Sequence, residues 1–209
     1  MMPLSNSIAE FRSGVSQINA IIQKACDSDS SGNDIFDDSQ KEFIISSAFL
    51  KMFIYWESFV EESFASYLIG EVSTNGTAVT THVTPADKDH ALKMLIGTQK
   101  YVDWANHEIV RRLANLYLEN GEPFSSNISS IARDLSDLKT VRNAAAHLSS
   151  TTQHQLDALA SRVLGHTVSN ATVANFILRL RPDDATKTIL QKYQELLDLA
   201  AENIAGNVT

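Results

Sequence analysis

The sequence predicts an all-α fold, and three observations lead to this. The chain has only 4 prolines and 8 glycines among 209 residues, so few residues interrupt a helix. Apolar side chains recur at helical spacing along most of it, as the amphipathic helices of a bundle require. The hydrophobic content of 44% is enough for the core of one domain of this length. We therefore expect a single helical domain over residues 1–209.

The first half of the chain is expected to supply the core. A first helix over residues 7–24 has an apolar stripe of Ile8, Phe11, Val15, Ile18 and Ile22. A polar, acidic loop follows at residues 27–38. The second helix, over residues 40–69, has the most hydrophobic sequence. Its apolar residues at helical spacing are Ile44, Phe49, Met52, Phe53, Trp56, Val60, Phe64 and Tyr67. This helix should form the spine of the core.

The second half is expected to hold shorter helices. Asn120-Gly121 and Pro123 should stop the helix expected over residues 100–118, because they favour a helix end. Residues 71–85 should form a loop, and an extended stretch over residues 173–180 is possible. The expected helices are 85–96, 100–118, one beginning near 127 and running past 142, 153–164 ending at Gly165, and 184–204.

The helix that begins near residue 127 carries the most informative segment, residues 142–147, Arg-Asn-Ala-Ala-Ala-His. At about 100° per residue, Leu138, Val141, Ala145 and Leu148 fall on one core-facing stripe. His147 then projects roughly 140° from the centre of that stripe. It should face away from the core, with small alanines leaving room for a ligand or another helix.

The charge balance limits what this segment can bind. A net charge of −8 argues against a broad nucleic-acid-binding surface, because long-range affinity for phosphate comes from clustered Lys and Arg. Contact with a nucleic acid should therefore be local. The basic residues that could form a local patch, or simply be solvated helix residues, are Arg111, Arg112, Arg133, Lys139 and Arg142.

Two segments resemble a known family. Val-Arg-Asn-Ala-Ala-Ala-His-Leu, at 141–148, is similar to the Arg-x(4–6)-His signature of the HEPN superfamily. Phe-Ile-Tyr-Trp-Glu-Ser-Phe-Val-Glu, at 53–61, is similar to the Tyr-x-x-Glu-x-Phe/Val helix of stand-alone bacterial HEPN proteins of the RiboL-PSP-like group. The resemblance covers about residues 5–150, leaving 151–209 as a C-terminal helical extension.

The resemblance implies an up-and-down helical bundle, a two-fold homodimer and metal-independent endoribonuclease activity. Arg142, Asn143 and His147 are the positions that match the catalytic motif, and Glu57 matches an acidic position near it. The implied substrate is RNA, cleaved through its own 2′-hydroxyl. His147 would act as general acid or base, Arg142 would hold the phosphate, and Asn143 would orient one of them. An antitoxin or a defence-system protein is a possible partner.

Three alternatives stay open. A HEPN-like dimer could bind RNA, a nucleotide or a protein without cutting anything. An unrelated helical interaction protein could carry the motif by chance. Glu57 could pair with Arg142 or simply extend to solvent from the flank of its helix.

Other site classes are not indicated. Asp27-Ser28-Asp29-Ser30-Ser31-Gly32 begins like a calcium loop, but Asp38 stands where that loop has Glu, so a solvated linker is the better interpretation. The other histidines show no metal-ligand spacing, and we expect no cofactor. The single cysteine allows no intrachain disulfide. With no signal peptide and no apolar run of membrane-spanning length, we expect a cytoplasmic protein.

Overall fold

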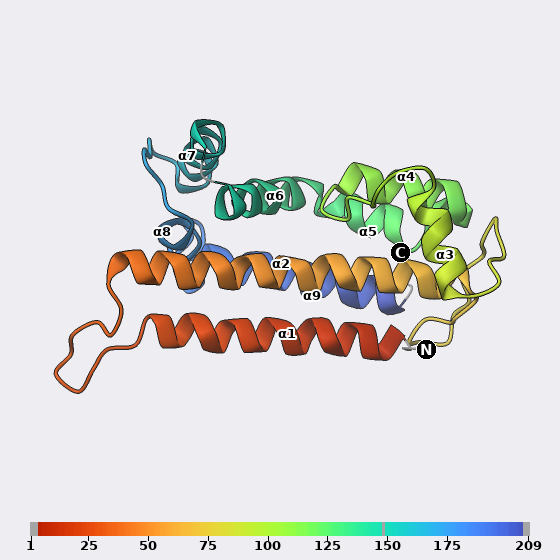
Figure 1. Ribbon diagram of the computed structural model, residues 1–209, viewed down its shortest axis with the longest axis horizontal. Helices are drawn as coiled ribbons and strands as arrows, with labels where there is room; N and C mark the ends of the chain where they lie inside the picture. The colour runs from red at the N-terminus through yellow and green to blue at the C-terminus, as the bar shows by residue number, and fades with distance from the viewer. Residues whose placement is uncertain (1–3, 148, 207–209) are drawn as a thin grey trace. The chain divides into compact units, whose positions relative to one another are not determined.

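The chain is folded almost entirely into α-helices, as predicted. The computed structural model describes residues 4–147 and 149–206, and these contain no β-strand, only three isolated bridges. The elements are α1 (Leu4–Ala25), α2 (Asp38–Leu68), α3 (Lys88–Ile96), α4 (His107–Tyr117), a 3-10 turn (Glu119–Gly121), α5 (Phe124–Ser130), α6 (Ala132–Ala146), α7 (Ser150–Leu164), α8 (Val173–Ile177) and α9 (Ile189–Gly206) (Figure 1).

The helices build two compact units. Unit 1 comprises residues 1–12, 55–136 and 196–209, and unit 2 comprises residues 13–54 and 137–195. Four helices, α1, α2, α6 and α9, contribute residues to both units. Each unit is therefore assembled from segments that lie far apart in the sequence.

Unit 1 has an aromatic core. Phe11 of α1 packs edge-on against Trp56 of α2, with ring centroids 5.9 Å apart. Further along α2, the ring of Phe64 stacks on Phe124 of α5, and Tyr67 meets Phe124 edge-on. Aromatic pairs of this kind add about 0.5–1.5 kcal/mol each beyond their burial. They explain why the second predicted helix is so rich in aromatic residues.

The α9 segment closes unit 1 with polar contacts. Tyr67 is fully buried, so its hydroxyl needs a partner within the protein. It donates to the carbonyl oxygen of Ile204 at 2.6 Å. Arg12 of α1 forms ion pairs with Asp198 and Glu202 of α9, each at 2.6 Å. The last helix of the structure therefore packs against parts of the first and second helices within this unit.

Unit 2 has an aliphatic core with two aromatic rings of α2, Phe49 and Phe53, stacked within it. Leu138 and Val141 of α6 are fully buried, as their positions on the predicted stripe require. Ala145 of that stripe is half-buried, and Leu148 lies outside the described residues. α6 thus buries one face in the core of this unit.

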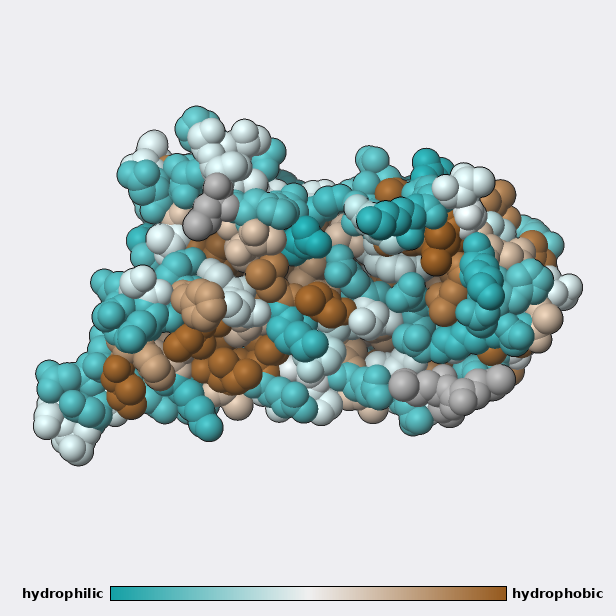
Figure 2. All heavy atoms as spheres, in the orientation of Figure 1, coloured by the Kyte–Doolittle hydropathy of each residue, from teal (hydrophilic) through white to brown (hydrophobic). Residues whose placement is uncertain are grey.

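The loop between α1 and α2 is polar, as predicted. It is the hydrophilic projection at the lower left of Figure 2, at the position that the orange loop occupies in Figure 1. The carboxylate of Asp29 accepts hydrogen bonds from the backbone N–H groups of Ser31 and Asn33, at 2.8 and 2.9 Å. These local bonds lower the pKa of Asp29 and give the loop its turn.

α2 is the one helix of the described residues that is long and apolar enough, by length and composition, to cross a membrane. From the sequence, no apolar run of membrane-spanning length was expected. The core helix of a soluble protein meets the same criterion, and 44% of the apolar window is buried within the structure. The burial of Phe49, Met52 and Phe53 in unit 2 is what a core helix shows.

Two predicted helices have different limits in the structure. The helix predicted over residues 100–118 begins only at His107, because the Asn106 side chain caps it by accepting a hydrogen bond from the N–H of Glu108. The helix predicted from residue 127 onward is two helices, α5 and α6. They are separated at Ile131, whose φ of −116° and ψ of 19° leave the helical region.

The C-terminal region differs more. Residues 173–177, predicted as part of a possible extended stretch, form the short helix α8. Thr172 caps this helix by accepting a hydrogen bond from Asn175 N–H. α9 begins at Ile189 rather than at residue 184, whereas α7 ends before Gly165 as predicted, with Gly165 in the left-handed conformation.

Candidate active site

Arg142 and Asn143 lie on the flank of α6, half-buried beside the fully buried Leu138 and Val141. Nη1 of Arg142 donates a hydrogen bond to Oδ1 of Asn143 at 3.3 Å. Among the described residues of unit 2, no carboxylate lies within ion-pair distance of this guanidinium. Its charge is therefore not neutralised within its own unit, and its other N–H groups are available to an anion.

His147 follows the last helical residue of α6 and is exposed, as the helical projection predicted. Its backbone N–H still donates to the carbonyl oxygen of Asn143 at 2.9 Å, which continues the helical pattern by one residue. Its own carbonyl oxygen accepts a hydrogen bond from Oγ1 of Thr152 at 2.6 Å. The backbone of His147 is thus held by two hydrogen bonds, while the residue remains exposed.

The turn after His147 is fixed by a capping box at the start of α7. Oγ of Ser149 accepts from the N–H of Thr152 at 3.1 Å, and Oγ1 of Thr152 accepts from the N–H of Ser149 at 3.2 Å. The helix was expected to begin only at residue 153, three residues later than Ser150. The Ser-x-x-Thr spacing was the signal that would have located the helix start.

A pocket of about 380 Å³ lies beside His147 in unit 2. Two residues of the predicted segment line it, His147 and Ala144, whereas Arg142 and Asn143 lie outside it. The alanine leaves the space that the sequence analysis expected beside the polar groups. The remaining lining residues are Glu42, Ser149, Ser150, Thr152, Gln153, Leu156, Ala171, Thr172 and Val173.

One wall of the pocket depends on Glu42, a residue that the sequence analysis did not identify. Its carboxylate accepts hydrogen bonds from the N–H groups of Val173 and Ala174 at 3.1 and 2.9 Å, and from the hydroxyl of Ser46 at 2.6 Å. A negative charge at the N-terminus of α8 is favourable, because the first N–H groups of a helix have no partner within it. Glu42 therefore holds α8 in place.

A second wall is fixed by Gln153 and Asp157 of α7. Nε2 of Gln153 donates both of its hydrogens, to Asp157 Oδ1 and to the carbonyl oxygen of Ala171, each at 2.9 Å. Asp157 also accepts from the N–H groups of Asn170 and Ala171. Burial alone would raise the pKa of Asp157, but these hydrogen bonds outweigh it and lower the pKa. The loop before α8 is thereby tied to α7.

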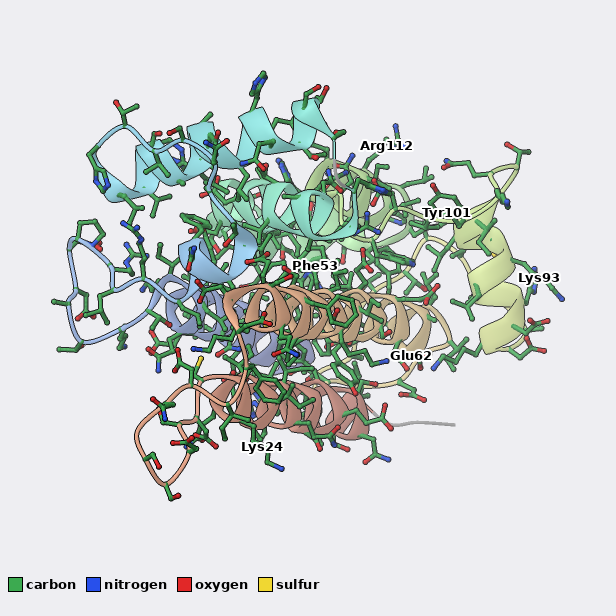
Figure 3. All side chains as sticks on the ribbon, turned by 60° about the vertical axis from the view of Figure 1, so that its left-hand side comes forward. Lys24, Phe53, Glu62, Lys93, Tyr101 and Arg112 are labelled. Atoms are coloured by element: carbon green, nitrogen blue, oxygen red, sulfur yellow. The ribbon has the colours of Figure 1, made fainter. Side chains whose placement is uncertain are left out.

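The remaining predicted residues do not extend this site. Glu57 is half-buried on α2 and belongs to unit 1, so its pairing with Arg142 stays a prediction. The predicted basic patch is divided between the two units. Arg111, Arg112 and Arg133 lie in unit 1, where Arg112 projects outward from α4 (Figure 3), and Lys139 and Arg142 lie in unit 2.

Within the described parts of the chain, no group of three or more His, Cys, Asp or Glu side chains is placed to hold a metal ion. Comparison with known proteins finds no matching protein family, no matching curated protein and no matching solved structure.

Proposed function

We propose that this protein is an endoribonuclease of HEPN type that cleaves RNA without a metal ion. The observation that supports the proposal best is the end of α6, where an exposed imidazole and a guanidinium with no carboxylate partner in its unit occur within six residues. An imidazole titrates near neutral pH, and a guanidinium binds phosphate oxygens with two parallel hydrogen bonds. These are the two groups that strand cleavage of RNA requires.

In the proposed reaction the 2′-oxygen of one ribose attacks the adjacent phosphorus, and the bond from phosphorus to the 5′-oxygen of the next nucleotide breaks. The products are a 2′,3′-cyclic phosphate and a free 5′-hydroxyl. His147 takes the proton of the 2′-hydroxyl or supplies one to the leaving 5′-oxygen. Arg142 binds the non-bridging oxygens and stabilises the charge that develops there. Asn143, hydrogen-bonded to Arg142, holds the guanidinium in position.

One imidazole cannot readily be base and acid in the same step, so we propose a two-fold homodimer that brings together two copies of the segment 142–147. Light scattering at micromolar protein concentration tests this part. A mass of 46 kDa, twice the 23.0 kDa of the chain, is expected, and a monomeric mass contradicts the composite site.

Glu57 is proposed as a residue that orients Arg142. Glu57→Gln should then lower the cleavage rate without unfolding the protein, because the amide can still accept a hydrogen bond but carries no charge. A rate equal to that of the unmodified protein would remove Glu57 from the site. We place the activity in the cytoplasm and propose an antitoxin or a defence-system protein as the partner that controls it.

The decisive experiment uses two RNAs of identical sequence, one of them with 2′-deoxy sugars throughout. The purified protein is incubated with each RNA in excess chelator, and the ends of the products are identified. We expect cleavage of the ribose strand only, leaving 2′,3′-cyclic phosphate ends, and no cleavage by His147→Ala. Cleavage of the deoxy strand, or 3′-hydroxyl ends, would contradict the 2′-hydroxyl mechanism.

The pocket beside His147 favours one alternative, a protein that binds a nucleotide or RNA without cutting it. Arg142 and Asn143 do not line that pocket, so binding in it does not by itself require them. Binding of RNA with no cleavage under any of the above conditions would support this alternative.

A further inference from the structure

We infer that the pocket lined by Ala144, His147, Gln153 and Glu42 binds a nucleobase that carries an exocyclic amino group. The inference rests on the proposed function, because it assigns the pocket to the base of a nucleotide next to the cleaved phosphate. A base linked to a ribose whose oxygen approaches the imidazole must lie within a few ångströms of His147. His147 is one of the residues that line the pocket.

The size and the walls of the pocket suit a flat heterocycle. Its volume of about 380 Å³ lies within the usual range of small-molecule sites. Apolar side chains of Ala144, Leu156 and Val173 form part of the lining, and Leu156 and Val173 are buried. Two of its polar side chains, Glu42 and Gln153, have partners that fix their orientation, so their remaining hydrogen-bonding capacity can be counted.

Gln153 contributes an acceptor. Both hydrogens of its Nε2 are used by Asp157 and by the carbonyl oxygen of Ala171, which fixes the orientation of the amide. Its Oε1 therefore has no protein donor among the described residues and keeps its lone pairs for a ligand.

Glu42 also presents acceptor capacity, whereas the hydroxyl oxygen of Thr152 already accepts from the N–H of Ser149. Of the roughly four lone-pair positions of a carboxylate, three on Glu42 are taken by Val173, Ala174 and Ser46, and one on Oε2 remains. The hydroxyl hydrogen of Thr152 is used by the carbonyl oxygen of His147. Together with Oε1 of Gln153, the pocket therefore has two polar atoms that can only accept, whereas the hydroxyl groups of Ser149, Ser150 and Thr172 and the imidazole of His147 can donate or accept.

A ligand that matches these walls must bring N–H donors. Adenine and cytosine have an exocyclic amine at the edge where uracil has a carbonyl group, and guanine has its amine at a different ring position. An acceptor that faces a carbonyl group would be left without a partner, and burying a polar group unpaired costs binding. The pocket should therefore prefer amino-bearing bases over uracil, which gives the enzyme a preference for the nucleotide at this position.

The sharpest probe is the pair of adenosine and inosine 5′-monophosphates, which share phosphate, sugar and ring size. In inosine the 6-amine, with two N–H donors, is replaced by a carbonyl, and the neighbouring ring nitrogen carries a single hydrogen. Each nucleotide is titrated into the whole chain, and binding is measured by calorimetry and by the NMR signals of the His147 imidazole. The adenosine nucleotide should bind about tenfold more tightly or better, which is the effect of one lost hydrogen bond. Equal affinities would overturn the argument from the amine.

Two variants in which an alanine is replaced by leucine test where the nucleotide binds. Ala144→Leu fills the pocket from α6 and should abolish binding, whereas Ala158→Leu, at an exposed position of α7 outside the pocket, should leave it unchanged. If Ala144→Leu does not fold, the shift of the His147 signals in the unmodified protein still decides whether the nucleotide lies in this pocket. Binding that leaves these signals unmoved would contradict the assignment.

The outcomes separate this inference from the proposed function. RNA cleavage together with failure of both nucleotides to bind at 10 mM would overturn the base pocket and leave the nuclease standing. Selective binding of the adenosine nucleotide without RNA cleavage would support the pocket and remove the nuclease. A preference for cleavage beside amino-bearing bases that disappears in Ala144→Leu would support both.

Discussion

Replacing His147 by alanine should remove the activity and leave the fold intact. Removing a general acid or base typically lowers a rate by about 10²–10⁴, which corresponds to about 2.7–5.4 kcal/mol in the activation barrier. The structural cost is small, because the two hydrogen bonds that hold this residue use its backbone N–H and carbonyl group and survive the substitution. The exposed side chain gives up no core packing, so the free energy of unfolding should change by no more than about 0.5 kcal/mol.

The assay is the initial rate of cleavage of a fluorescent RNA, with urea unfolding measured on the same preparations. His154→Ala is the matched control, because His154 is also exposed in unit 2 but does not line the pocket. If the His147 variant cuts within about threefold of the control, the imidazole takes no part in the chemistry. If it instead loses several kcal/mol of stability, His147 is a structural residue and the site has been misassigned.

Three further substitutions test other contacts. Arg142→Lys should lower cleavage about tenfold with little change in stability, because an ammonium cannot make the bidentate phosphate contact; an unchanged rate would exclude that contact. Tyr67→Phe should destabilise the protein by about 1–3 kcal/mol in urea unfolding, since the buried carbonyl of Ile204 loses its donor, while Tyr101→Phe, at a 67% exposed position, should have no effect. The pKa of Asp157 is lowered in the folded protein, so its carboxylate stabilises the fold at pH values above its unfolded pKa and loses this effect as the pH falls through its folded pKa. The difference in free energy of unfolding between the unmodified protein and Asp157→Asn should therefore shrink on acidification, and a constant difference would refute this.

The helices that could be predicted well were those whose signals are local. α1, α2 and the end of α7 follow from periodic apolar residues and from the glycine after Leu164. The burial of Leu138 and the exposure of His147 follow from the same periodicity. For the candidate site, Arg142 and Asn143 lie on α6 as expected, and His147 lies one residue beyond its end.

The features that could not be predicted depend on distant contacts. α8 has only five residues, and the carboxylate that satisfies its first N–H groups belongs to Glu42, 131 positions earlier in the chain. The pocket was missed for this reason, since α8 and its preceding loop supply much of its wall. The break at Ile131 could not be predicted either, because an isoleucine carries no local stop signal.

The contacts of α9 bear on how the chain is made. Arg12 finds its acidic partners 186 and 190 positions later, and in unit 2 the side chain of Asn19 hydrogen-bonds Gln194, 175 positions later. During synthesis on the ribosome, α1 and the most apolar helix of the chain therefore emerge long before the segment that completes their packing. Closing loops of this length slows folding and prolongs the exposure of apolar surface. The nascent chain should thus depend on chaperones until α9 has left the exit tunnel.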